Sequence, residues 1–246
     1  MNIEQHIVLA GTAAAAYAVF GLTGFGAAMV AVPVLVQFIP LHFVVPMLLL
    51  LDLTATTLVG LRNWSLVSRR ELVRLFPFML AGVALGTTAL ANVEPRWLLM
   101  GLGTFVILMT VRTLLMSKGQ LEQVGGVWAV PAGVVGGTFS ALFGTGGPIY
   151  TMYLSRRLPH IDQFRATISA VILASALVRL GTFAAGGLLQ QADLLRSAAF
   201  AMPFGLLGLA AGSRLRRHIA PDTVRRALLL FLAASGASVL YRGMLL

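Results

Sequence analysis

GLTGFG, residues 21–26, interrupts a run of apolar residues near the N-terminus, and FGTGGP, residues 143–148, interrupts a second run after mid-chain. Glycine in a helix interior costs about 1 kcal/mol relative to alanine. Each stretch therefore predicts a break in a membrane helix, at which backbone N–H groups are released. Within lipid such groups must be satisfied by protein, by water in a cavity or by a ligand, so the two breaks are the first candidates for a functional site.

The composition is that of a polytopic, all-α membrane protein. Hydrophobic residues make up 58% of the chain and charged residues 11%, with a mean hydropathy of +0.90, whereas soluble domains carry about 25% charged residues. The net charge of +10 is assigned to cytoplasmic loops, not to nucleic-acid binding. The chain has no cysteine and its four histidines are scattered singly, so we expect no metal site and no cofactor. Its acidic residues are dispersed, which argues against an enzyme with paired catalytic carboxylates.

Eight apolar stretches are long enough to span a bilayer, which takes about 20 residues. Two of them, Ile7–Ile39 and Val127–Leu154, run longer and contain the glycine breaks. The other six are His42–Leu61, Leu72–Ala91, Trp97–Met116, Phe164–Leu189, Leu194–Ser213 and Val224–Leu246. Because long and short stretches follow the same order in both halves, we predict an internal duplication. The repeats are residues 1–118 and 119–246, within a single integral membrane domain.

Short motifs support the duplication. PFMLAGVALGT, residues 77–87, matches PFGLLGLAAGS, residues 203–213. At a slightly shorter offset, residues 24–27 (GFGA) fall on residues 144–147 (GTGG). The glycines of the first pair of motifs are expected to pack helices closely, and the two breaks are predicted to be copies of one element.

The basic residues predict the topology. They cluster in four places, which are residues 62–74, 112–118, 156–165 and 214–226. If all eight segments crossed once, the first two clusters would lie on the opposite side from the last two, against the positive-inside rule. If the two long segments instead turn back at their breaks, all four clusters are cytoplasmic and the repeats are inverted. That pattern is typical of secondary transporters with a substrate site near the midplane. A long, kinked crossing at each break is the alternative.

The sequence resembles a known family in GLTGFGAAMVAVP, residues 21–33, and SALFGTGGPIYTMYL, residues 140–154. This is the TauE/SafE sulfite-exporter family of bacterial membrane permeases, and the resemblance covers essentially the whole chain. It implies a multi-pass protein of the bacterial inner membrane that exports small organosulfur or related anions, such as sulfite, sulfoacetate or sulfonates, coupled to an ion gradient. The first motif is less glycine-rich than in many members. A passive anion channel or facilitator, and an importer of another small organic anion, stay open as alternatives.

The expected substrate-binding residues lie at the two breaks. A helix that restarts after a break directs unpaired N–H groups and a partial positive charge at one spot, so two such ends facing each other would hold an oxyanion. Hydroxyl donors come from Thr23 and Thr145, and Pro148 can start a half-helix because it lacks an N–H. The set is Thr23, Gly24, Gly26, Gly144, Thr145, Gly146, Gly147 and Pro148, together with Arg179. Alternatively, the glycines only let helices cross closely.

Two charged residues lie inside predicted spans, where charges are expensive and usually functional. Asp52 is expected to serve coupling or gating by exchanging a proton, or else to make a structural hydrogen bond. Arg179 could bind the anion, pair with Asp52 or extend to the interface. The arginines at segment ends, Arg62, Arg112 and Arg165, are assigned to topology. The expected partners are therefore a small anion, protons as the coupling ion and the lipid bilayer, with a homo-oligomer left open.

Overall fold

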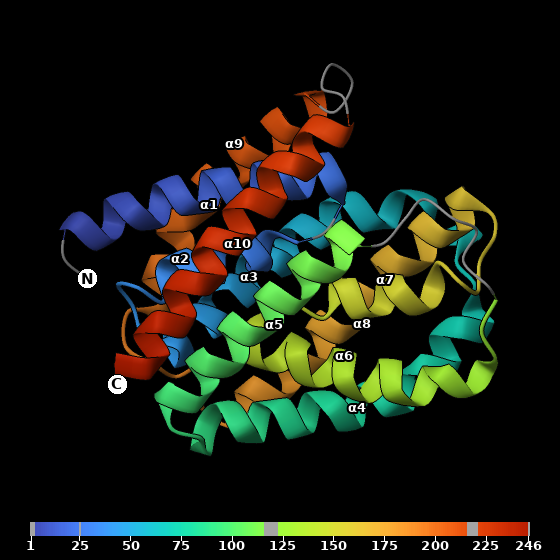
Figure 1. Cartoon of the computed structure of the whole chain (residues 1–246), viewed down its shortest axis with the longest axis horizontal. Coiled ribbons are helices and arrows are strands. Elements are labelled where there is room, and N and C mark those ends of the chain that lie inside the picture. Colours follow the sequence, from blue (N-terminus) through green and yellow to red (C-terminus); the bar gives the residue numbers. More distant parts are fainter. Residues whose placement is uncertain (1–2, 25, 116–122, 216–220, 246) are drawn as a thin grey trace. The chain divides into compact units, whose positions relative to one another are not determined.

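In the computed structural model, every element of the described part of the chain is a helix (Figure 1). The described residues are 3–24, 26–115, 123–215 and 221–245, with the side chains of 59–63 and 221–227 excepted. The helices are α1 (Ile3–Thr23), α2 (Ala27–Leu35), α3 (Leu41–Gly60), η1 (Leu61–Leu66), α4 (Arg69–Asn92), α5 (Pro95–Leu115), η2 (Gly126–Trp128), α6 (Ala129–Phe143), α7 (Gly147–Leu154), α8 (Ile161–Ala185), α9 (Leu194–Leu215) and α10 (Pro221–Leu245). Part of the basic clusters lies outside the described part of the chain, namely Lys118, Arg216, Arg217 and the side chains of Arg62, Arg225 and Arg226.

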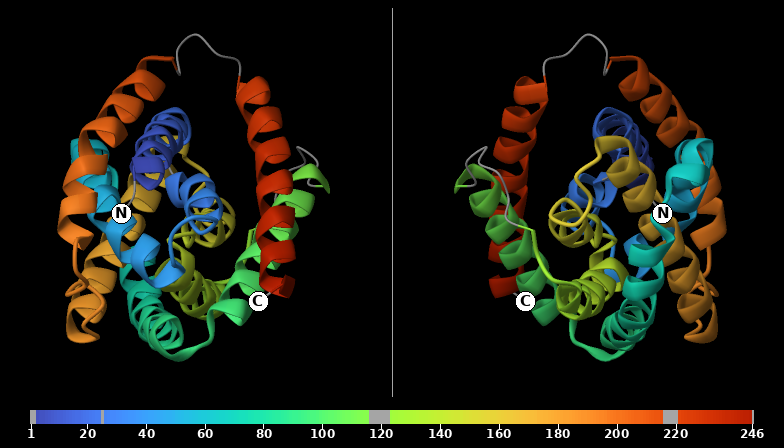
Figure 2. Two further views of the ribbon diagram at one scale, coloured as in Figure 1. Left: turned by 90° about the vertical axis from the view of Figure 1, so that its left-hand side faces the viewer. Right: turned by 90° about the vertical axis from the view of Figure 1, so that its right-hand side faces the viewer.

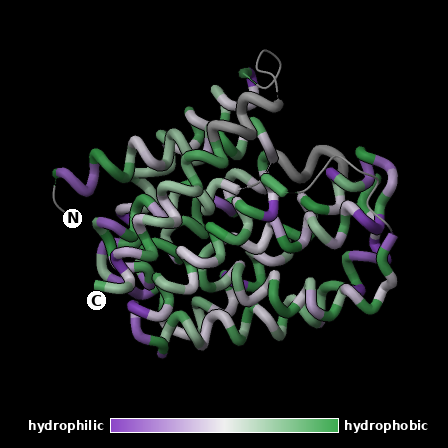
Figure 3. The backbone as a smooth tube through the Cα atoms, in the orientation of Figure 1, coloured by the Kyte–Doolittle hydropathy of each residue, from purple (hydrophilic) through white to green (hydrophobic). Residues whose placement is uncertain are grey.

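Eight helical segments in the described residues are long and apolar enough to cross a membrane. They lie in α1, α3, α4, α5, α6 with the turn before it, α8, α9 and α10. The bounds of six of them agree with predicted apolar stretches to within a few residues, whereas each of the two long stretches, Ile7–Ile39 and Val127–Leu154, contains one such segment followed by a short helix. The prediction of an all-α polytopic membrane protein is confirmed. Figure 3 shows hydrophobic residues along the helices, with hydrophilic residues gathered mainly at helix ends and connecting segments.

Each of the two long predicted segments forms two helices separated by glycines. Between α1 and α2, Gly24 and Gly26 adopt φ angles of 87° and 91°, and Gly144, which follows α6, adopts 68°. These left-handed conformations are open to glycine at little cost. We call residues 24–26 the first break and residues 144–146 the second break.

The described part of the chain forms two compact units. The first unit comprises Met1–Leu48, Asn92–Gly119 and Ala192–Leu246. Within it α1 packs along α9 and α5 packs along α10, as Figures 1 and 2 show. A Cβ atom added at Gly208 or Gly212 of α9 would strike the backbone of α1 at Ala14 or Ala18. The glycines of the PFGLLGLAAGS motif therefore allow these two helices to touch through their backbones.

The second unit comprises Leu49–Ala91 and Gln120–Gln191. Here α4 packs on α6 in the same manner, because a Cβ atom at Gly82 would strike the backbone of Val134 and one at Gly86 would lie 2.5 Å from the carbonyl oxygen of Thr138. The Thr138 hydroxyl also donates to the carbonyl of Gly82, at 3.1 Å. The short helix α7 packs on α6 and α8.

The ends of each broken segment are hydrogen bonded to each other. In the first unit, Gln5 at the start of α1 donates from Nε2 to the carbonyl of Phe38 beyond α2, at 3.0 Å. In the second unit, Arg157 beyond α7 donates from Nη1 to the carbonyl of Val124 ahead of α6, at 2.9 Å. The chain thus runs out along one helix and back along the next. We call α1 with α2 the first hairpin and α6 with α7 the second hairpin.

Candidate functional site

The second break ends one helix and starts the next. The N–H of Gly144 donates to the carbonyl of Ser140 at 2.8 Å, which closes α6 through a left-handed glycine. Helix α7 then begins at Gly147, with Pro148 in its first turn, where a missing N–H costs nothing. In this turn Pro148 has no N–H and Ile149 donates to the carbonyl of Gly146 at 3.1 Å, so this end of α7 offers an anion the N–H of Gly147 and the partial positive charge of a helix start.

The first break is built differently. Gly24 donates its N–H to the carbonyl of Phe20 at 2.7 Å and closes α1, and Gly26 is also left-handed. The hydroxyl of Thr23 donates to the carbonyl of Val19 at 2.8 Å, so it is engaged within its own helix. Because this break belongs to the first unit and the other break to the second, the pairing of the two breaks around one anion stays a prediction.

A buried ion pair lies next to the second break. Arg179 is 2% exposed and Asp52 is 8% exposed, and the guanidinium Nη2 lies 3.7 Å from the carboxylate Oδ2. Arg179 Nη1 donates to the carbonyl of Ser140 at 3.2 Å, which is the same carbonyl that accepts from Gly144. Of the three roles considered for Arg179, pairing with Asp52 is therefore present, and its burial shows that the side chain does not extend to the interface.

Two hydroxyls, one in the second break and one in α7, are buried without a hydrogen-bond partner in the described residues. Thr145 and Tyr150 are each 1% exposed, and neither hydroxyl bonds to any described residue. The Tyr150 hydroxyl lies beside Ser175 and Arg179, but without hydrogen-bond geometry to either, while Ser175 shares a 2.8 Å hydroxyl bond with Ser140. A buried hydroxyl without a partner costs free energy, so the site has donors available for an acceptor such as an oxyanion.

Comparison with known proteins identifies the class. Residues 8–239 match the family described as Sulfite exporter TauE/SafE. The chain belongs to this family. The assignment made from the two glycine motifs is thereby confirmed. TauE/SafE proteins are membrane transporters with small-molecule substrates, so the protein is a transporter and not an enzyme.

A curated relative supports the location of this TauE/SafE protein. The chain is 30% identical over 194 residues to the "Probable inner membrane transporter protein TsaS" of Comamonas testosteroni, an alignment that covers 78% of this chain and 81% of the relative. No solved structure matches the chain. The predicted location in the bacterial inner membrane is confirmed, since the name of the relative gives that membrane and eight segments of the described residues are fit to span a bilayer.

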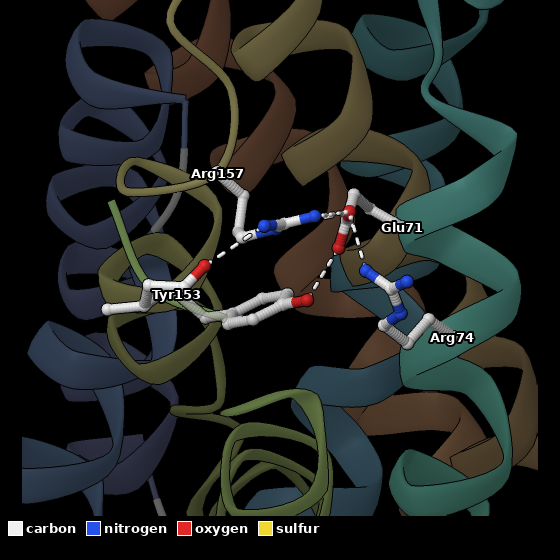
Figure 4. A network of polar contacts seen from close by, with 5 residues as sticks. Glu71, Arg74, Tyr153 and Arg157 are labelled. Carbon is white, nitrogen blue, oxygen red and sulfur yellow. Dashed lines mark hydrogen bonds and ion pairs between the residues drawn. The ribbon is translucent and has the colours of Figure 1, made fainter. Parts of the chain in front are cut away.

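A second ionic network in this TauE/SafE protein was missed by sequence reasoning. Glu71, in the first turn of α4, is 3% exposed and accepts from Arg157 at 2.9 Å and 3.2 Å, from the Tyr153 hydroxyl at 2.5 Å and from Arg74 at 3.1 Å (Figure 4). The carboxylate raises the pKa of Arg157 by stabilising its charged form. One acidic residue among the arginines of SRRELVR, residues 68–74, was the available signal for this network.

Proposed function

We propose that the protein is a secondary transporter that carries a small organosulfur or related anion, such as sulfite, sulfoacetate or a sulfonate, and exports it from the cell. The family description supports the substrate class, and the second break has groups that suit an oxyanion. These groups are the first turn of α7, the hydroxyls of Thr145 and Tyr150, and the guanidinium of Arg179. Thr145 and Arg179 belong to the set expected from the sequence, and Tyr150 is added by its position.

The observation that carries this proposal is the buried pair of Arg179 and Asp52. Its separation of 3.7 Å is longer than the 2.9 Å between Arg157 and Glu71, and it exceeds the usual 2.7–2.9 Å or so of a charge-assisted hydrogen bond. A buried charge is costly unless it is well paired. Arg179 also donates to the carbonyl of Ser140, and we infer that a substrate anion can take the place of Asp52 beside this buried cation.

Charge balance then links the anion to a proton. With Asp52 ionised, the pair is neutral and Asp52 competes with the substrate for Arg179. Once the anion takes Arg179, an ionised Asp52 would be a second negative charge in a poorly solvated site, which is unfavourable. Proton uptake by Asp52 removes that charge, so the anion and the proton move together. The net direction follows the sum of their two gradients, and export occurs where the anion accumulates inside.

Contacts in the second unit support the inverted topology. Arg74, from the first basic cluster, and Arg157, from the third, meet at Glu71. These two clusters thus lie at the same end of the second unit, as the topology with turned-back segments requires and eight single crossings do not allow. The hydrogen bonds that close both hairpins support the same topology. Each repeat would then cross the membrane three times, with α3, α4 and α5 matching α8, α9 and α10.

Helix packing supports the internal duplication. Gly82 of α4 meets the backbone of Val134 in α6, and Gly208 of α9 meets the backbone of Ala14 in α1. Gly82 and Gly208 are matching positions of the PF-containing motifs, and Ala14 and Val134 match at the offset that relates the two breaks. The same contact therefore occurs twice, in agreement with two repeats that divide near residue 118.

Flux measurements in proteoliposomes test the coupling. Methanesulfonate is a suitable probe because it is a fixed monoanion across the neutral range, so that a pH change acts on the protein alone. We expect wild-type uptake to rise when the outside is more acidic than the lumen, and Asp52→Asn to lose that response. Asp193→Asn is the matched control, since Asp193 pairs with Arg196 at 3.1 Å on an exposed surface, and it should respond like wild type.

Each alternative gives a different result. A passive channel or facilitator shows flux that ignores the pH gradient in the wild type. An Asp52→Asn variant that keeps the full response refutes the role of Asp52 in coupling. Uptake of simple carboxylates without any uptake of sulfonates contradicts the organosulfur assignment and favours an importer of another organic anion.

A further inference from the structure

Both ends of the second hairpin are fastened to α4 through one carboxylate. Glu71 accepts hydrogen bonds from Tyr153 in the last turn of α7 and from Arg157 just beyond it. Arg157 in turn donates to the carbonyl of Val124, ahead of α6. The segment entering the hairpin is therefore joined to the segment leaving it at Arg157, which binds Glu71; Figure 4 shows the side chains around this carboxylate.

The groups that face Glu71 are two guanidiniums and one hydroxyl. Arg74 reaches it from α4, Tyr153 from α7 and Arg157 from the turn after α7. The Glu71 side chain is 4% exposed, whereas those of Arg74 and Arg157 are 28% and 23% exposed. The arginines can therefore exchange the carboxylate for water, while Glu71 cannot leave without breaking the network.

The two helices of the second hairpin are held to α4 in different ways. Helix α6 contacts it through backbone packing at Gly82 and Gly86, which no solvent molecule can replace. Helix α7 has 8 residues, follows the second break, and reaches α4 through the polar contacts of Tyr153 and, just beyond it, Arg157. The Arg157 contact is part-buried and can be exchanged for water at modest cost, whereas the Tyr153 bond is buried. Helix α7 also packs on α6 and α8, so its contact with α4 is the part of the hairpin that can open while α4 and α6 stay together.

We propose that Glu71 is a positioning residue that locks α7 against α4, and that α7 swings away from α4 when this lock opens. Because α7 begins at the second break, opening the lock at its C-terminal end moves Gly147 and Pro148 at its N-terminal end. The lock goes beyond the transport proposal, since it does not depend on which anion is carried or on a coupled proton.

Single-cysteine labelling tests the lock, because the native chain has no cysteine to react in the background. Thr151→Cys is the reporter on α7, and Thr56→Cys is the matched reporter on α3. Both hydroxyls are buried and without a hydrogen-bond partner among the described residues, so neither replacement removes a bond. In purified full-length protein, Glu71→Gln should raise the rate at which N-ethylmaleimide labels the Thr151→Cys reporter at least about tenfold, since it removes the buried charge that both arginines and the Tyr153 hydroxyl bind and charge-assisted hydrogen bonds are about twice as strong as neutral ones.

The same Glu71→Gln change should leave labelling of the Thr56→Cys reporter unchanged, and Glu71→Asp, which keeps the carboxylate, should restore slow labelling at Thr151→Cys. Unchanged labelling of the α7 reporter in Glu71→Gln refutes the lock. Faster labelling of both reporters also refutes it, because Glu71 would then stabilise the whole unit. If Glu71→Gln does not fold, Tyr153→Phe removes one bond of the network and should give a smaller rise confined to α7. Labelling does not require transport, so failure of the lock and failure of the transport proposal are distinguishable.

Discussion

Gly146→Ala should impair transport although alanine is the smallest possible addition. Gly146 has φ −67° and ψ −23°, an ordinary helical conformation, so its backbone does not require glycine. Glycine is required instead by the lack of space around this residue. An added Cβ atom would lie 2.6 Å from the carbonyl oxygen of Gly136, 2.8 Å from Cβ of Ser140 and 3.0 Å from the ring of Tyr150.

The magnitude follows from these distances. Ordinary van der Waals contact begins at 3.4 Å, and the carbonyl at 2.6 Å belongs to the backbone of α6, so α6 and α7 must separate by several tenths of an ångström. Overpacking of this kind costs about 1–3 kcal/mol, which corresponds to roughly a 5-fold to 150-fold loss of the closed hairpin. We expect methanesulfonate flux to fall about tenfold or more, with the protein still inserted in the membrane.

The control is Gly181→Ala in α8 of the same unit. An added Cβ atom there meets nothing within 4 Å, and alanine stabilises a helix interior by about 1 kcal/mol relative to glycine. Its flux should match the wild type and its melting temperature should not fall. Wild-type flux in Gly146→Ala, or an equal loss in Gly181→Ala, would refute the argument that close contact between α6 and α7 forms the site.

Two further predictions concern helix packing and the site. Gly208→Ala and Gly82→Ala should each lower the melting temperature and the yield of folded protein, because the new Cβ atom strikes a facing backbone. The control is Gly11→Ala, which should be tolerated because its Cβ atom meets nothing within 4 Å. Equal melting temperatures for all three variants would contradict the packing argument. Thr145→Val should leave thermal stability unchanged, because the lost hydroxyl has no partner. The same variant should bind methanesulfonate about tenfold or more weakly in a titration. An unchanged affinity would show that Thr145 is not part of the site.

The membrane class and the positions of the breaks were predictable from local properties of the sequence. A run of about 20 apolar residues is a sufficient signal for a span, and glycine clusters inside such runs mark helix ends because glycine is costly in a helix and free to be left-handed. The structure ends α6 at Phe143 and starts α7 at Gly147, on either side of the predicted break. The family assignment rested on the same motifs.

The contacts around the breaks were not predictable in the same way. Glu71 and Arg157 are far apart in the chain, and a carboxylate among arginines at a helix end usually indicates a solvated charge. Tyr150 is part of an apolar-looking segment, and only the fold reveals that its hydroxyl is buried beside Arg179. The pairing of Arg179 with Asp52 was one of three open roles, because helix rotation decides whether a charge faces a partner or the lipid.

The distribution of charge argues that the two breaks are unequal in function. Within the described residues, the buried charged side chains are Asp52, Glu71 and Arg179, and all three belong to the second unit. Among the described residues of the first unit, the buried polar side chains carry hydroxyls only, at Thr12, Tyr17, Thr110 and Ser197. A helix end alone supplies a partial charge, whereas a buried arginine supplies a full one. We therefore infer that the second break provides most of the binding energy for the anion. Since α7 has this site at one end and the contacts to Glu71 at the other, movement of one short helix suffices to link substrate occupancy to the opening of the hairpin.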